Sequence, residues 1–201
     1  MHVILASASP ARLSVLRAAG LHPEVVVSGI DESGVAGKPA DVVQTLAERK
    51  AMAVAETWRA THQADDDRDA VVIGCDSLLD FNGQAFGKPN DDDETVARWK
   101  LMRDQVGVLH TGHCLVRTDD GRRASAVAST EVTFGHPTDA EIDAYAATGE
   151  PLRVAGSFTI DGYGGWFIDH LSGDHGTVLG LSLPLTRTLL TTLDIPLTTL
   201  W

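Results

Sequence analysis

The feature that most constrains the fold is a long apolar run over Ala70–Phe81, which carries Asp76 and Ser77 near its centre. Such a run is typical of a buried strand. The dipeptide Asn82-Gly83 follows at once, and it is the pattern of a tight β-hairpin turn between apolar segments. Because helical segments occur on both sides, the sequence predicts an α/β chain with a sheet of mixed strand direction.

The rest of the chain also divides into strand and helix patterns. Further strands are expected over residues 2–6, 23–27, 108–117 and 124–134, with a strand and loop over the glycine-rich residues 156–168. Helices are expected over residues 10–20, 41–61, 91–106, 138–149 and 183–193. No repeat or long linker divides the chain, so residues 1–201 are interpreted as one domain.

Charge and apolar patterning restrict the function classes. The net charge of -12 at pH 7 argues against a nucleic-acid partner, because affinity for phosphate backbones comes from clustered Lys and Arg. A small nucleotide needs only a few converging cations and is not excluded. No secretory signal is recognised, and no stretch approaches the roughly 18 apolar residues of a membrane span. We therefore expect a cytoplasmic protein without a membrane partner, in which Cys75 and Cys114 are free thiols.

A candidate anion site lies between the first strand and the first helix. Ser7, Ser9 and Arg12 occur there, with Pro10 at the first helical position. A helix N-terminus presents unpaired N–H groups, and hydroxyl and guanidinium groups would add donors for phosphate oxygens. The alternative is an ordinary helix cap with a solvated arginine.

Asp76 is the most unusual residue, because an unpaired carboxylate is costly to bury in an apolar strand. It needs a cation, a metal or a catalytic role, unless the strand bends and leaves it solvated. Lys88 lies in a Gly-Lys-Pro turn, and the hairpin could return it to the same end of the strand. Taken singly, Lys88, Lys50 on a helix and Glu32 in a loop are more typical of a solvated surface.

Several other patterns do not support a site. His110 and His113 are three residues apart on an expected strand, so they point to opposite faces. The acidic run 65–67 lacks the spaced ligands of a calcium loop, and the run 91–93 suits the start of a helix. No Gly-x-Ser-x-Gly elbow or Gly-x-x-x-x-Gly-Lys-Ser/Thr loop occurs, which argues against a serine hydrolase and excludes the P-loop NTPases.

The ordered motifs resemble those of the Maf family. Leu5–Pro10 with Arg12 is similar to its Ser-x-Ser-Pro-Arg-Arg signature, Gly74–Ser77 is similar to its Gly-Ala-Asp-Thr strand, and Gly87–Pro89 matches outright. Further correspondences lie, in order, at Asp31-Glu32, Glu48–Ala51, His110–Gly112, Tyr145–Leu152, Ala155-Gly156 and Gly180–Leu185. The resemblance therefore covers essentially the whole chain.

The resemblance implies a two-lobed α/β fold with a central cleft, similar to that of inosine triphosphate pyrophosphatase. It implies hydrolysis of a nucleoside triphosphate to its monophosphate and pyrophosphate, with a divalent metal cation, Mg²⁺ or Mn²⁺. The substrate-binding residues would be Ser7, Ser9, Arg12, Lys50, Ser77 and Asp161. Glu32 and Asp76 would hold the metal or activate the attacking water, and Lys88 would contribute to catalysis by holding the triphosphate.

Three departures leave the base preference open. The family's double arginine is Ala11-Arg12 here, and Ser77 replaces a threonine while keeping the hydroxyl. Asp161 stands where pyrimidine-selective members often carry Gln, and a carboxylate only accepts hydrogen bonds. The substrate is therefore expected to be a pyrimidine triphosphate, such as UTP or dTTP, or a modified nucleotide.

Two alternative functions remain. One is a non-catalytic nucleotide-binding regulator of cell division, since the family is named for effects on septum formation. The other is a generic α/β binding module, and the ordered motifs are the only sequence evidence against it. Retention of Glu32, Lys50, Asp76 and Lys88 favours catalysis, because a sensor would not need the full set. The resemblance is also compatible with a homodimer, although no residue indicates one.

Overall fold

The computed structural model describes residues 1–62 and 69–201, so the acidic run 65–67 lies outside the described part. Its strands are β1 (His2–Leu5), β2 (Glu24–Val25), β3 (Ala70–Phe81), β4 (Gln84–Phe86), β5 (Val106–Arg117), β6 (Arg123–Phe134) and β7 (Ile168–Ser172). Its α-helices are α1 (Pro10–Ala18), α2 (Pro39–Thr61), α3 (Asp92–Met102), α4 (Asp139–Ala146), α5 (His175–Leu179) and α6 (Leu183–Thr192).

The described strands form one mixed sheet in the order β2-β1-β3-β5-β6-β7, with β4 paired to β3. β1 runs parallel to β2 and β3, whereas β3, β5, β6 and β7 pair antiparallel in turn. The β3–β4 hairpin turns at Asn82 and Gly83, with φ angles of 52° and 81°. Left-handed conformations at both positions suit a tight two-residue turn. The predicted mixed sheet and hairpin are confirmed.

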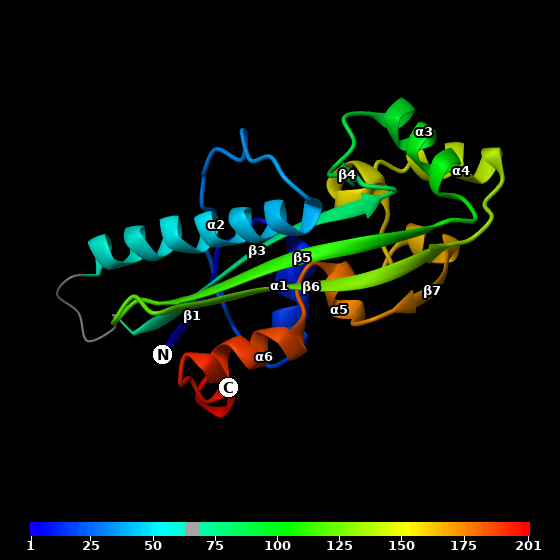
Figure 1. Ribbon diagram of the computed structural model, residues 1–201. Coiled ribbons are helices and arrows are strands. Elements are labelled where there is room, and N and C mark those ends of the chain that lie inside the picture. The colour runs from blue at the N-terminus through cyan, green and yellow to red at the C-terminus, as the bar shows by residue number, and fades with distance from the viewer. Residues whose placement is uncertain (63–68) are drawn as a thin grey trace.

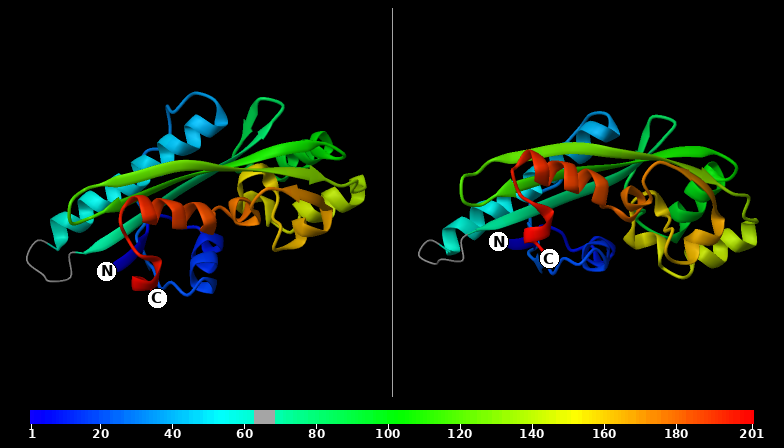
Figure 2. Two further views of the ribbon diagram at one scale, coloured as in Figure 1. Left: turned by 60° about the horizontal axis from the view of Figure 1, so that its bottom comes forward. Right: turned by 90° about the horizontal axis from the view of Figure 1, so that it is seen from below.

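The molecule has two lobes, and three long strands connect them. β3, β5 and β6 each span 12 residues and run through both lobes (Figure 1). In the first lobe, α2 covers one face of the sheet, while α1 and α6 cover the other (Figure 2). In the second lobe, α3 and α4 pack against the strand ends around an aromatic core. There, the Trp99 ring meets Phe134, Tyr145 and Phe167 edge to face.

Two expected segments differ most from the structure, while the strand expected over 23–27 and the helix expected over 138–149 are shorter, at Glu24–Val25 and Asp139–Ala146. The helix expected over 91–106 ends at Met102, because Arg103 has a non-helical ψ of 130° and Asp104 has a left-handed φ of 61°. The strand expected within 156–168 begins only at its last residue, where β7 starts. Before it, the chain forms the 3₁₀ turns η3 (Ala155–Ser157) and η4 (Tyr163–Phe167).

Other local expectations are confirmed. Ser9 caps α1, and Thr138 forms a capping box with Glu141 at the start of α4. Cys75 and Cys114 are buried free thiols. Within residues 1–62 and 69–201, no helix is long and apolar enough to cross a membrane.

Candidate functional site

Helix α2 lies very close to the sheet, because two glycines leave room for its backbone. A Cβ added at Gly74 on β3 would lie 2.4 Å from the carbonyl oxygen of Ala47. One added at Gly112 on β5 would lie 2.2 Å from the carbonyl oxygen of Val43. Both distances are far shorter than a van der Waals contact. Only glycine therefore permits this packing. The close approach places Lys50, on the next turn of α2, within reach of Asp76 at the centre of β3.

Lys50 joins two carboxylates from different parts of the chain. Its Nζ lies 2.6 Å from Oδ1 of Asp76 on β3 and 2.9 Å from Oε1 of Glu32 in the loop before α2. Lys50 and Asp76 are each 8% exposed, whereas the Glu32 side chain is 56% exposed. The sequence prediction that Asp76 needs a buried partner is confirmed, and the alternative of a solvated Asp76 is wrong.

The pKa of Asp76 is raised above its ordinary value. Burial is the main cause, because it disfavours the charged carboxylate. The charge of Lys50 and its hydrogen bond oppose the rise in pKa, and Arg12 adds a weaker effect of the same sign. A carboxylate whose pKa is moved toward neutrality is a better proton acceptor than an ordinary aspartate.

Arg12 is buried and links three segments. Its Nε donates to the Gly180 carbonyl at 2.9 Å, and its Nη1 donates to Ser7 Oγ at 2.9 Å and to the Cys75 carbonyl at 2.8 Å. Its Nη2 donates to Ser77 Oγ at 3.0 Å. These bonds use four of the five guanidinium N–H groups, so one Nη2 proton has no acceptor among the described residues. The alternative of a solvated arginine is wrong.

Hydroxyl groups continue this network. Ser77 Oγ lies 2.9 Å from Thr111 Oγ1, which donates to the Thr177 carbonyl at 2.8 Å. Ser9 Oγ accepts from the Arg12 backbone N–H at 3.4 Å, and the Ser9 N–H donates to Ser7 Oγ at 3.2 Å. The β1–α1 loop and the centre of β3 are thus fixed to each other through Arg12.

Lys88 and Asp161 lie outside this cluster. Both residues are exposed, and no hydrogen bond or ion pair joins them to the cluster within the described ranges. The β3–β4 pairing ends with Leu79 and Phe86, and Lys88 follows two residues after that last pair. Asp161 lies in the loop between η3 and η4. Their roles at the site stay predictions.

Glu150 is a structural residue of this loop that the sequence did not single out. Its Oε1 accepts hydrogen bonds from Tyr145 Oη at 3.1 Å, Thr159 Oγ1 at 2.6 Å and the Gly164 N–H at 3.1 Å. Its Oε2 accepts from the Tyr163 N–H at 3.1 Å. Burial alone would raise the pKa of Glu150, but these donors outweigh it and hold the pKa below its usual value. Its place before a proline in the family-like segment 145–152 was the only available signal.

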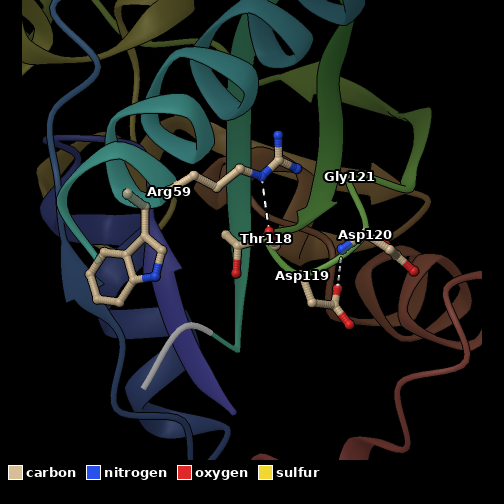
Figure 3. Close-up of a pocket in the computed structure, with 6 residues that line it drawn as sticks. Arg59, Thr118, Asp119, Asp120 and Gly121 are labelled. Atoms are coloured by element: carbon tan, nitrogen blue, oxygen red, sulfur yellow. Dashed lines mark hydrogen bonds between the residues drawn. The ribbon is translucent and has the colours of Figure 1, made fainter. Parts of the chain in front are cut away.

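Two surface pockets lie away from the cluster. One, of about 630 Å³, lies beside the end of α2 and the β5–β6 turn, where Arg59 donates to the Thr118 carbonyl at 2.9 Å (Figure 3). A second, of about 360 Å³, is lined by residues that include His136 and Trp166. Neither contains a candidate site residue. No cluster of three or more His, Cys, Asp or Glu in the described chain could hold a metal ion alone.

The chain is similar to known proteins over nearly its full length. A family model described as Maf-like protein matches residues 2–193. The chain is 56% identical over 200 residues to the nucleoside triphosphate pyrophosphatase of Streptomyces coelicolor, covering 99% of this chain and 94% of the relative. The Salinispora tropica protein of the same name is 55% identical over 202 residues, covering 100% and 88%. That of Rhodococcus erythropolis is 46% identical over 208 residues, covering 99% and 96%.

Proposed function

The chain belongs to the family of Maf-like proteins, and we propose that it hydrolyses nucleoside triphosphates to the monophosphate and pyrophosphate. Relatives at 46–56% identity over nearly the full chain carry the name of that activity. The observation that carries the proposal is the buried Lys50–Asp76 pair, with Glu32 on the same ammonium group. Arg12 lies against the next residue of β3, Ser77, through a hydrogen bond of 3.0 Å.

The reaction adds one water across the anhydride bond between the α- and β-phosphates, so one product is pyrophosphate and the water loses a proton. Asp76 is suited to take that proton, because burial raises its pKa. Lys50 holds the Asp76 carboxylate in place and supplies positive charge beside the phosphates. The remaining Arg12 proton and the exposed Lys88 would contact phosphate oxygens, whose negative charge must be neutralised for cleavage.

A magnesium or manganese ion fits this donor set. Such ions take oxygen ligands, and Mg²⁺ usually binds one or two carboxylates together with substrate phosphates and water. Asp76 and Glu32 both contact the Lys50 Nζ, so their oxygens are no farther apart than the sum of those two short distances. Of the two carboxylates, Glu32 would hold the ion, which leaves Asp76 to take the proton of the attacking water. When bound, the ion would neutralise phosphate charge and lower the pKa of a coordinated water.

The base is proposed to be a pyrimidine or a modified base. Asp161 is the candidate contact, and its loop is held by Glu150 through Thr159 and Gly164. A carboxylate accepts but does not donate, so it would pair with an N–H group such as N3–H of uracil or thymine. UTP and dTTP are therefore the first substrates to compare with modified nucleotides.

The test is pyrophosphate release from a panel of canonical and modified triphosphates with Mg²⁺ or Mn²⁺, beside the Asp76→Asn variant. We expect monophosphate and pyrophosphate in equal amounts, and a loss of at least about a hundredfold in kcat for the variant. Circular dichroism of both proteins checks that the variant is folded. Nucleotide binding without turnover by the folded wild-type protein would instead support the non-catalytic regulator.

A further inference from the structure

The Gly-Lys-Pro turn that carries Lys88 is fixed by contacts from outside the hairpin. The Gly87 carbonyl accepts hydrogen bonds from Arg98 Nη1 on α3 at 2.7 Å and from the Gly156 N–H at 3.1 Å. Lys88 itself is exposed. The direction in which it leaves the backbone is therefore set by its neighbour, Gly87, which two separate segments hold.

The other side of the turn is held by the same helix. Asn90 donates from its backbone N–H and from Nδ2 to Glu94 Oε2, at 2.8 and 2.7 Å. The second oxygen of Glu94 pairs with Arg98 Nη2. The Arg98 guanidinium also lies 4.8 Å from the centre of the Phe86 ring on β4. Glu94 and Arg98 thus bracket the turn from both of its ends.

Arg98 connects this turn to a strained backbone position. Ser157 is fully buried and has a φ of 61°, which a non-glycine residue adopts only when its surroundings hold it there. Its Oγ accepts from Arg98 Nη1 at 3.3 Å, and its carbonyl accepts from Trp99 Nε1 at 2.8 Å. Two successive residues of α3 therefore hold the loop that begins at η3 together with the Lys88 turn.

We propose that Arg98 is a positioning residue that fixes Lys88 for triphosphate cleavage, an inference that rests on the proposed function. Arg98 does not need to reach the substrate, since its side chain is 12% exposed and both terminal nitrogens have protein acceptors. The planar guanidinium bonds a carbonyl and a carboxylate at once, which the single ammonium of lysine does less well. The last β3–β4 pair, Leu79 with Phe86, lies two residues from Ser77 along β3 and two residues from Lys88 along the other strand.

A double-mutant cycle tests whether Arg98 acts through Lys88. We expect Arg98→Met to lower kcat/KM for the best triphosphate by about ten- to a hundredfold, the range expected for a displacement of about 1 Å. In the Lys88→Ala background, the same change should cost less than about twofold. Arg98→Lys should restore part of the loss. Equal losses in both backgrounds, or unchanged activity of Lys88→Ala, would overturn the proposal.

A second variant and a second measurement guard against misfolding and inactivity. Glu94→Gln keeps the shape of the side chain but weakens its pairing with Arg98, and it should show the same dependence on Lys88 in the cycle. Hydrogen exchange of the Asn90 and Gly156 amides, which donate to Glu94 and to the Gly87 carbonyl, should quicken in Arg98→Met while exchange in β5 stays unchanged. That readout does not depend on turnover. An inactive wild-type protein would refute the proposed function, whereas unchanged exchange would refute the positioning role.

Discussion

Replacing Gly74 by alanine is the sharpest test of how the site is assembled. The added Cβ would lie 2.4 Å from the carbonyl oxygen of Ala47 and 2.8 Å from the backbone nitrogen of Ala51. A carbon–oxygen contact of about 3.3 Å requires the two backbones to separate by about 1 Å. No side-chain rotation can relieve the contact, because both neighbours are backbone atoms of α2. The helix must move away from β3.

Two consequences follow in Gly74→Ala. Overpacking of this kind costs about 1–3 kcal/mol in the free energy of unfolding, and the upper end is expected because backbone must shift. Lys50 lies on the same stretch of α2, so the shift lengthens its 2.6 Å contact with Asp76. A displacement of about 1 Å at a catalytic group lowers the rate by up to about a hundredfold. A domain stabilised by about 5–15 kcal/mol stays folded, so the lost rate reports the displacement.

The assay combines urea unfolding with pyrophosphate release by the folded variant. Gly87→Ala is a matched control for stability, because its added Cβ would meet only Leu78 Cδ2 at 3.4 Å, an ordinary contact. The control should change the free energy of unfolding by less than about 1 kcal/mol. If Gly74→Ala were as stable and as active as the wild-type protein, the close approach of α2 would not be what positions Lys50.

Three further outcomes are expected. His113 is buried and neutral, with Nε2 accepting from the Ser182 N–H, and burial lowers its pKa to about 4. In the unfolded chain, the His113 imidazole takes up a proton near pH 6.5. About 3 kcal/mol of the free energy of unfolding should therefore be lost as the pH falls from 6.5 to 4. Urea unfolding of His113→Gln at the same pH values should not show this loss. Glu150→Ala should raise KM and reduce the difference in kcat/KM between the preferred nucleotide and the others, and Glu150→Gln should have a smaller effect. If kcat/KM for the different nucleotides kept the wild-type ratios in Glu150→Ala, this expectation would be contradicted. A chelator should abolish turnover and added Mg²⁺ or Mn²⁺ should restore it, so full activity in the chelator would remove the metal from the proposal.

The sequence predicted the framework of the site well, because strong signals were involved. The apolar run over Ala70–Phe81 matches β3 residue for residue, and the Asn-Gly turn is where the hairpin closes. The cost of burying Asp76 correctly required a partner inside the protein. These inferences depend on burial and turn geometry, which residue types largely determine.

What the sequence could not supply were long-range contacts and unusual backbone angles. The hydrogen bonds of Arg12 to Ser77 and to the Gly180 carbonyl span 65 and 168 residues. Asp104 and Ser157 adopt left-handed backbone angles although neither is a glycine, so the sequence did not predict these conformations. The first ends α3 early, and the second interrupts the strand expected after residue 156. Both conformations are imposed by tertiary contacts.

The charges at the site are unevenly paired, because both carboxylates of the cluster contact Lys50 and neither contacts Arg12. The cluster contains two cations, Arg12 and Lys50, and both carboxylates beside them, those of Asp76 and Glu32, contact Lys50. The hydrogen-bond acceptors of Arg12 in the described chain are hydroxyl and carbonyl oxygens, so no carboxylate contacts it directly. A buried charge without a counter-charge is costly, and an anionic ligand compensates for it. The Arg12 guanidinium can therefore favour an anionic ligand at this cluster even though the chain carries a net charge of -12.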